Sequence, residues 1–397
     1  MVRVLVTDGE SRAALAAVRA LGRAGHTVYV SAPRLPSLAS VSRFAAGSAV
    51  VPPTPLLAEQ PGQVVGRLRE LANAWDADVV LPVTDAAMSA VLRCGGSGMG
   101  RAVVAGPTLE AYEAVSDKAA LLARAARLGC PVPRSAVAAS PSELSAAATQ
   151  VGYPCVLKPP SSVGASAGRA SGFGTRYVES STALDAASVG APYPLLVQER
   201  IVGTGEGIFL LLDRGRRIAA FAHRRLREKP PSGGVSTYRE SVPLAPDVLE
   251  LAERLLGDVA WQGVAMVEFK RCARTGRAYL MEVNGRLWGS LQLAIDAGVN
   301  FPELLVRVAL GQPAAPVDGY RIGVRSRWLW GDVDHLVARL RHSRATLHLE
   351  PDAPSLLRTL WEFVHFWRPA DRIEVWDSAD PQPFWTETAA WLRGRSS

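Results

Sequence analysis

Cysteine is scarce in this chain of 397 residues, which contains only four. They are widely scattered, and no pair has the C-x-x-C spacing of zinc sites and redox motifs. The four positions are Cys94, Cys130, Cys155 and Cys272. This pattern argues against a zinc site and against a disulfide framework, so we expect reduced thiols, most of them buried.

Long apolar runs are lacking as well. No stretch approaches the roughly 18 apolar residues that cross a bilayer, and the apolar run near the N-terminus is too short for a signal peptide. The sequence therefore predicts a protein without a membrane span, located in the cytoplasm. The net charge of +7 comes with dispersed arginines and no basic block, so no nucleic-acid partner is expected. A homodimer remains open.

The first part of the chain has no G-x-G-x-x-G loop, which argues against a nicotinamide-dependent dehydrogenase. It has a β-α-β pattern instead, followed by further strands. The expected strands are residues 2–6, 26–31, 49–51, 77–82 and 102–105, and the expected helices are 11–25 and 63–75. Residues 1–110 are therefore predicted to form an open parallel α/β domain. Asp85 follows one strand at the edge where ligands bind in such sheets, although it could equally cap the next helix.

Two lysines lie beside features that suit an anion. Asp117 is expected to cap a helix, which puts Lys118 in the first turn, where the helix dipole disfavours a cation. Lys158 lies near the end of a strand over 153–160, and the small residues 161–168 that follow could bring backbone N–H groups against a polyphosphate. The spacing differs from the Walker motif, so this is not a P-loop. A surface lysine and a plain hairpin turn are the alternatives.

Oxygen ligands are predicted to gather on a hairpin. Glu282 and Asn284 are two residues apart on a strand that begins near residue 279, so both side chains point to one face. Glu268 ends a separate apolar run, and residues 271–277 could turn the chain back so that Glu268 lies beside Glu282. Carboxylate and amide oxygens in one cluster suit Mg²⁺. The alternative is an ordinary solvated strand face.

Between these motifs lie a linker and a basic segment. A strand over 195–203 passes into a polar linker whose backbone could meet an adenine edge, and Glu206 could bind ribose hydroxyls. A strand over 219–222 leads into the cationic stretch 223–236, which is predicted to be a loop that closes over phosphates and a carboxylate. A plain connection and an exposed mobile loop are the alternatives.

The order of these motifs resembles the ATP-grasp superfamily, in particular its carboxylate-amine ligases and carbamoyl-phosphate-synthase-like members. The resemblance covers roughly residues 1–312. It implies an α/β and α+β chain with an N-terminal domain over 1–110, a first ATP-grasp lobe with the phosphate loop over 111–198, and a second lobe with the metal site over 199–315. Residues 316–397 would form an accessory C-terminal region.

The resemblance also assigns roles to the residues. The phosphates of ATP would be held by Lys118 and Lys158, under a flexible loop containing Ser161, Ser162, Gly164 and Ser166. Adenine would meet Glu199, Arg200, Ile201 and Val202, and ribose would meet Glu206. Two Mg²⁺ ions, with Mn²⁺ as an alternative, would be bound by Glu268, Glu282 and Asn284. Arg286 would stabilise the transferred phosphoryl group, while His223, Arg224 and Arg225 are candidates for holding the carboxylate or handling a proton.

The implied activity is that of an ADP-forming ligase, which phosphorylates a small-molecule carboxylate and couples the acyl phosphate to an amine. Such chemistry needs positioning and charge neutralisation rather than a protein nucleophile. Two alternatives remain open. One is a bicarbonate-activating enzyme of the carboxylase or carbamoyl-phosphate type. The other is a nucleotide-binding regulatory protein without turnover, against which the joint presence of all the expected metal ligands speaks.

The last part of the chain departs from the best-known members of that superfamily. Residues 320–397 contain seven of the ten tryptophans, namely Trp328, Trp330, Trp361, Trp367, Trp376, Trp385 and Trp391. Apolar spacing around Leu336 and Leu340 and over 356–364 predicts at least two helices. We expect an accessory region packed on the catalytic core, with most of these tryptophans buried rather than forming a stacking platform.

Overall fold

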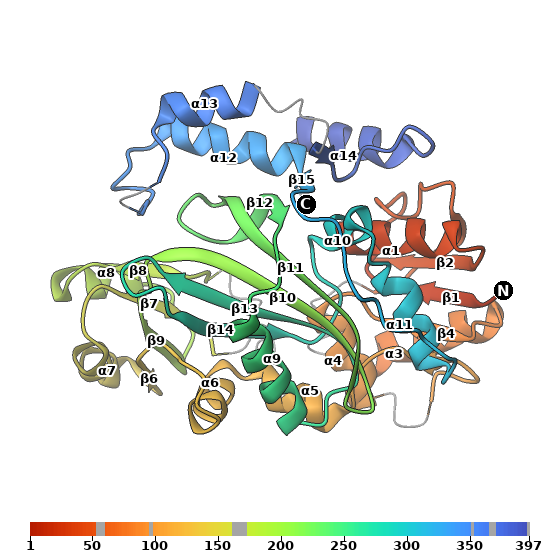
Figure 1. Ribbon diagram of the computed structural model, residues 1–397, viewed down its shortest axis with the longest axis horizontal. Coiled ribbons are helices and arrows are strands. Elements are labelled where there is room, and N and C mark those ends of the chain that lie inside the picture. Colours follow the sequence, from red (N-terminus) through yellow and green to blue (C-terminus); the bar gives the residue numbers. More distant parts are fainter. Residues whose placement is uncertain (53–59, 95–97, 161–172, 351–352, 365–370, 395–397) are drawn as a thin grey trace.

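Three sheets organise the chain. The computed structural model describes residues 1–52, 60–94, 98–160, 173–350, 353–364 and 371–394 (Figure 1). Within them lie a five-stranded parallel sheet, a four-stranded antiparallel sheet and a seven-stranded mixed sheet. No helix in the described ranges is long and apolar enough to cross a membrane.

The N-terminal sheet is parallel throughout, as the β-α-β pattern predicts. Its order is β3-β2-β1-β4-β5. The strands are β1 (Arg3–Val6), β2 (Thr27–Ala32), β3 (Ala45–Val50), β4 (Val79–Leu81) and β5 (Val103–Val104), and the helices are α1 (Arg12–Arg23), α3 (Pro61–Ala74), α4 (Asp85–Cys94) and α5 (Leu109–Ser116). Helix α1 begins where Ser11 Oγ accepts the N–H of Ala14 at 3.1 Å, which satisfies one free donor of the first turn.

The small lobe is the four-stranded antiparallel sheet with order β6-β9-β7-β8. Its strands are β6 (Ser135–Ala138), β7 (Cys155–Lys158), β8 (Arg176–Val178) and β9 (Leu195–Glu199). The helices of this part of the chain are α6 (Lys118–Arg127), α7 (Leu144–Val151) and α8 (Leu184–Ser188), with short 3₁₀ turns at Pro141–Glu143 and Ser181–Ala183. Lys118 and Lys158 therefore lie at the start of a helix and at the end of a strand, as expected.

The large lobe is the seven-stranded sheet with order β14-β13-β10-β11-β12-β15-β16. Its strands are β10 (Gly203–Asp213), β11 (Arg216–Lys229), β12 (Val235–Ser241), β13 (Gly263–Cys272), β14 (Ala278–Asn284), β15 (Arg325–Arg327) and β16 (Asp371–Ile373). Three helices belong to it, namely α9 (Pro246–Asp258), α10 (Leu291–Ala297) and α11 (Phe301–Ala309).

The predicted loop over 223–236 is wrong for half of its length. Residues 223–229 continue strand β11, and only the segment before Val235 turns the chain into β12. The charges are accommodated because β12 supplies an acid opposite: Arg224 lies across from Glu240 and donates to its carboxylate at 2.9 and 2.6 Å. Neutralised side chains can stand on a sheet face without breaking the strand.

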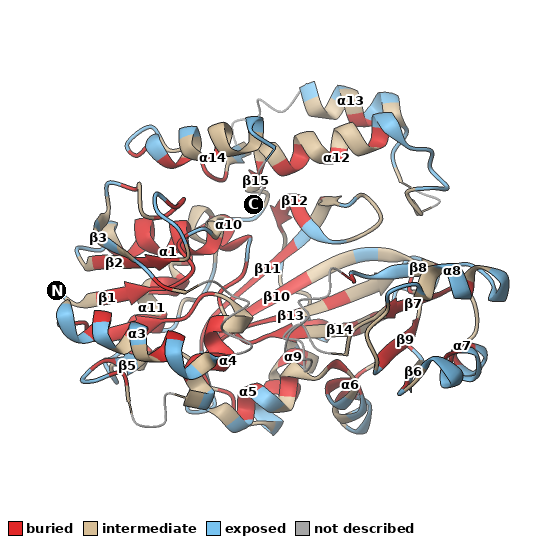
Figure 2. Ribbon diagram, turned by 180° about the vertical axis from the view of Figure 1, so that it is seen from behind, coloured by how far each residue is buried: buried red, intermediate tan, exposed pale blue. Residues whose placement is uncertain are grey.

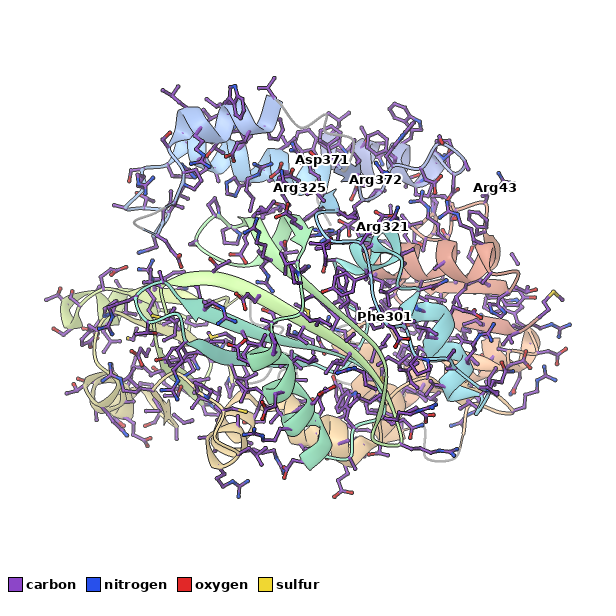
Figure 3. The ribbon with its side chains drawn as sticks, viewed as in Figure 1. Arg43, Phe301, Arg321, Arg325, Asp371 and Arg372 are labelled. Carbon is purple, nitrogen blue, oxygen red and sulfur yellow. The ribbon has the colours of Figure 1, made fainter. Side chains whose placement is uncertain are left out.

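A shared core joins the N-terminal domain to the large lobe. Helix α1 packs on α10 and α11, and the indole of Trp288 lies 4.3 Å from the ring of Phe209 and 5.0 Å from that of Phe301 between ring centroids. Phe301 is labelled at this junction in Figure 3. Figure 2 shows buried residues concentrated where the two parts meet. Apolar burial therefore fixes the N-terminal domain against the large lobe.

The C-terminal region forms a layer over β11 and β12 (Figure 1). Its helices are α12 (Leu329–Arg341), α13 (Leu356–Val364) and α14 (Gln382–Leu392), which confirms the two predicted helices and adds a third. The region is also part of the sheet, since β15 pairs with β12 and β16 pairs with β15. Arg325 and Asp371, labelled in Figure 3, lie at this junction.

The tryptophans of this region are not uniformly buried. Trp328 is buried and donates to Glu387 at 2.9 Å, and Trp330 stacks on Trp391 with ring centroids 4.3 Å apart. Trp361 and Trp385, in contrast, are more than half exposed. Trp367 lies outside the described residues. The expectation of tryptophans packed into the core therefore holds for Trp328 and fails for the exposed pair, because α13 and α14 turn one face to solvent.

Candidate active site

A cavity of about 710 Å³ lies between the two lobes. Strands β7, β11, β13 and β14 contribute to its walls, and so does the linker that follows β9. Segments of the C-terminal region complete it, among them parts of α12 and α13. Most of the residues singled out from the sequence lie around this cavity, although they come from distant parts of the chain.

The predicted acidic hairpin is present. Strands β13 and β14 are antiparallel, and their register puts Glu268 directly opposite Glu282. Asn284 lines the cavity beside them and donates from Nδ2 to Glu282 Oε1 at 3.2 Å. Two carboxylates and an amide oxygen on adjacent strands fit the oxygen ligands that Mg²⁺ prefers. No group of three or more His, Cys, Asp or Glu in the described ranges is arranged for a metal, so Asn284 is needed to complete this set.

The two lysines approach the same acids. Lys118 is buried, and its Nζ lies 3.2 Å from Glu282 Oε2. The predicted cap is confirmed, because Asp117 Oδ1 accepts the N–H of Ala120 at 2.8 Å. The backbone N–H of Lys118 donates to Pro160 O at 2.7 Å, which ties the start of α6 to the chain after β7. Lys118 is thereby held beside Glu282, which lines the cavity together with Lys158, although Lys118 itself is not among the lining residues.

The charges of this cluster are strongly coupled. Burial lowers the pKa of Lys158 to about 8, Glu282 opposes that change, and the positive charge of Lys118 adds to it. Burial would raise the pKa of Glu282, but Lys118 and Lys158 together hold it at about 2. Burial raises the pKa of Glu268. The positive charge of Arg225 lowers that pKa, whereas the negative charge of Glu282 raises it further, and the net change is upward. Glu282 is therefore the firmly ionised acid of the pair.

Two arginines that line the cavity contact residues of the hairpin. Arg225 reaches Glu268 at 2.5 Å and Glu228 at 2.8 Å. Arg286 donates to Asp85 Oδ2 at 2.8 and 3.0 Å and to Asn284 Oδ1 at 2.9 Å. Asp85 is the first residue of α4 and does not cap it, because Thr84 Oγ1 accepts the N–H of Ala87 at 3.2 Å. Its carboxylate holds Arg286 at the site instead.

His223 lies at the base of the cavity on β11 and is 1% exposed. Its ring meets the ring of Phe209 edge-on, with centroids 4.7 Å apart. Neither ring nitrogen has a hydrogen-bond partner among the described residues. Burial, together with the positive charges of Arg225 and Arg239, lowers the pKa of His223 well below its usual 6.5. The imidazole is therefore neutral near pH 7.

The predicted adenine linker borders the cavity. Glu199, Arg200 and Ile201 line it, whereas Val202 is not among the lining residues and accepts the N–H of Ala273 at 3.0 Å. Four residues of the expected phosphate loop, Ser161, Ser162, Gly164 and Ser166, lie outside the described residues.

Glu206 is not brought to the cavity. It lies inside β10, and its carboxylate accepts two hydrogen bonds from Arg271 at 2.7 and 3.0 Å. A different acid, Glu350, lines the cavity instead, 147 residues along the chain from the linker residue Gly203 that it contacts. Sequence reasoning missed Glu350 because no local pattern connects it to the linker.

Comparison with known proteins gives one family match and several relatives. Residues 192–329 match the family described as ATP-grasp in the biosynthetic pathway with Ter operon. The carbamoyl phosphate synthase large chain of Deinococcus radiodurans is 27% identical over 226 residues, which is 53% of this chain but only 21% of that protein. The formate-dependent phosphoribosylglycinamide formyltransferase of Anaeromyxobacter dehalogenans is 29% identical over 296 residues, covering 66% of this chain and 71% of the relative.

Solved structures share the fold at low identity. Biotin carboxylase of Campylobacter jejuni aligns with a TM-score of 0.63 and 18% identity, over 82% of this chain and 74% of its own. An L-amino acid ligase of Bacillus licheniformis aligns with a TM-score of 0.62 and 15% identity, over 78% and 74%. Residues 192–329 therefore match an ATP-grasp family model, and the solved structures show that most of the chain shares their fold.

Proposed function

We propose that this protein is an ATP-dependent, ADP-forming ligase that activates a small-molecule carboxylate as an acyl phosphate and couples it to an amine. The observation that carries the proposal is the charge arrangement of one cavity. Lys158 lines the cavity and Lys118 lies beside its Glu282, so both provide cations for phosphates. The opposed Glu268 and Glu282 provide metal ligands, and Arg286 provides a further cation in the same cavity.

The acidic hairpin would hold Mg²⁺. We assign Glu268, Glu282 and Asn284 as its ligands. We also predict that two ions bind, and that Mn²⁺ could replace Mg²⁺. When bound, the metal would neutralise phosphate charge. The chain's own contribution is to hold three oxygen ligands in a fixed register, since Asn284 is anchored both by Glu282 and by Arg286.

The first step would be phosphoryl transfer. An oxygen of the substrate carboxylate attacks the γ-phosphorus of ATP, the bond to the β-phosphate oxygen breaks, and ADP leaves. Lys118 and Lys158 hold the phosphates, and Arg286 donates to the equatorial oxygens as charge builds on them. Asp85 keeps the guanidinium of Arg286 in place through two hydrogen bonds, so little reorganisation is needed in the transition state.

The second step would form the amide. The amine nitrogen attacks the acyl carbon, the carbon–oxygen bond to phosphate breaks, inorganic phosphate leaves with the electron pair, and the amine loses a proton. His223 is the residue we assign to accept that proton, because it lines the cavity, is neutral and has no hydrogen-bond partner among the described residues. Arg225, held by Glu268 and Glu228, would fix the carboxylate end of the substrate.

ADP release with MgATP and hydroxylamine tests this function across a panel of amino acids and other small carboxylates. Hydroxamate in amounts that match ADP would establish carboxylate activation and identify the acid. ADP formation only after addition of bicarbonate would instead favour the bicarbonate-activating alternative. MgATP binding without ADP formation from any acceptor, bicarbonate included, would contradict the ligase proposal and leave a nucleotide-binding protein.

A further inference from the structure

A short segment of the C-terminal region lies against the linker between the two lobes. The carboxylate of Glu350 accepts the backbone N–H of Gly203 at 3.1 and 3.2 Å and forms an ion pair with Lys270 Nζ at 2.7 Å. Glu350 and the preceding Leu349 both line the cavity. An acid from outside the two lobes is therefore held by backbone and side chain at the edge of the proposed nucleotide site.

His348 anchors the same segment to the linker and to the small lobe. Its backbone oxygen accepts a hydrogen bond from Arg200 Nη2 at 2.7 Å. Its ring stacks on Tyr177 of β8 in the small lobe, with centroids 5.2 Å apart and ring planes 25° from parallel. These contacts fix the backbone next to Glu350, so the position of its carboxylate is set by packing as well as by charge.

The place of Glu350 along the cavity corresponds to the sugar of a nucleotide. Gly203 directly follows the linker 199–202 that is expected to meet the base. Lys270 is two residues beyond the metal acid Glu268 on β13, which puts it on the same face at about 6.8 Å along the strand. Glu350 touches both Gly203 and Lys270, so it lies between the base end and the phosphate end of the site.

The chemistry of Glu350 suits hydroxyl donors. A carboxylate has about four acceptor positions, and the contacts from Gly203 and Lys270 leave acceptor capacity on Oε2. The side chain is 23% exposed, so its remaining lone pairs can be reached from the cavity. The acid expected from the sequence, Glu206, is instead engaged by Arg271 and does not line the cavity.

We propose that Glu350 accepts hydrogen bonds from the ribose hydroxyls of the bound nucleotide, so that the C-terminal region completes the nucleotide site. This inference rests on the proposed function, because it requires that a nucleotide occupies the cavity. It gives the C-terminal region a direct part in substrate recognition. Loss of the segment would then weaken nucleotide binding even with every metal ligand in place.

The test compares the affinities of MgADP, 2′-deoxy-ADP and 3′-deoxy-ADP by titration calorimetry on the full chain. A hydrogen bond to a charged acceptor predicts that removing a hydroxyl weakens binding to the unmodified protein by about tenfold or more. In Glu350→Gln that preference should shrink to within about threefold. Glu206→Gln and the control Glu250→Gln, which removes an exposed acid paired with Arg254 on α9, should both keep the preference.

Each outcome separates the two claims. Equal affinity of the unmodified protein for ADP and both deoxy analogues would overturn the role of Glu350 and leave the proposed function standing. That comparison needs no variant, so it holds even if Glu350→Gln fails to fold. Loss of the preference in Glu206→Gln alone would return the ribose to Glu206. Failure of the unmodified protein to bind any of the three nucleotides would overturn the proposed function itself.

Discussion

Replacement of Glu282 by glutamine should disrupt both the metal site and the charge state of the lysines that are expected to bind phosphate. Its carboxylate is ionised because Lys118 and Lys158 hold its pKa at about 2 against the effect of burial, compared with an ordinary value of 4.5. One pH unit in a pKa corresponds to about 1.4 kcal/mol, so the ionised acid gains about 3 kcal/mol from its surroundings. That figure is an upper value, because water reaches 29% of the side chain.

The lysines should respond in turn. Lys158 has a pKa of about 8 even though Glu282 raises it, so Glu282→Gln should bring that pKa below 8. A lysine binds phosphate in its charged form, which predominates below its pKa. In the unmodified protein, affinity for metal-free ADP should therefore fall as the pH rises through about 8. In the variant the fall should come about one pH unit lower, and turnover with Mg²⁺ should drop by at least about 100-fold.

The assay is ADP binding in the presence of EDTA from pH 6 to pH 9.5, with thermal unfolding to confirm that the variant is folded. Glu253→Gln is the matched control, since Glu253 is partly exposed and forms its ion pair with Arg217. The control should keep both the midpoint near pH 8 and normal turnover. An unchanged midpoint in Glu282→Gln would refute the electrostatic reasoning, and near-normal turnover would refute the metal assignment.

Three further changes test other parts of the site. Arg286→Lys should lower kcat by about 100-fold while ADP affinity stays within about threefold, and a nearly unchanged kcat in steady-state assays would remove Arg286 from phosphoryl transfer. The pKa of His223 lies well below 6.5, so the pH profile of the rate of the unmodified protein should show no inflection from His223 near pH 6.5. His223→Asn should slow amide formation with the amine more than it slows hydroxamate formation. Equal slowing of the two reactions would contradict the role of His223 as proton acceptor. Asp332→Asn leaves Arg227 buried without the carboxylate that it contacts at 2.6 and 2.7 Å, so urea unfolding should show a loss of about 3–5 kcal/mol, and a loss below about 1 kcal/mol would argue against this link between β11 and α12.

The acidic hairpin could be predicted from the sequence because its determinants are local. Strand periodicity places Glu282 and Asn284 on one face, and a short turn leaves few registers in which Glu268 can pair. The same holds for the parallel N-terminal sheet, where β1, β4 and β5 are each followed by a helix. In both cases the information lies within about thirty residues.

The sequence predicts a loop where strand β11 continues, because a run of charged residues is typical of loops. Its arginines are accommodated by acids on other elements, among them Glu240 on β12 and Asp332 on α12. Alternation of apolar and polar residues is the usual sign of a half-buried strand, and it fails where both faces carry paired charges. The pairing of Arg227 with Asp332 joins residues 105 positions apart, which a local pattern does not contain.

Contacts that complete the site between residues far apart in the chain could not be predicted from the sequence for the same reason. Asp85 holds Arg286 across 201 residues, and Glu350 meets Gly203 across 147. Asp85 at least had a signal, its place at the carboxyl end of a parallel strand. Glu350 had none, because it lies in a region that the ATP-grasp resemblance did not cover.

The central claim is that the substrate carboxylate becomes an acyl phosphate, and transfer of isotope from that carboxylate tests it most directly. The acid selected by the hydroxamate screen would be labelled with ¹⁸O in its carboxylate and incubated with MgATP and the amine. The account predicts one ¹⁸O atom in each molecule of inorganic phosphate, because the oxygen that attacks the γ-phosphorus leaves with it. Unlabelled phosphate alongside amide product would contradict the acyl phosphate and the mechanism derived from it.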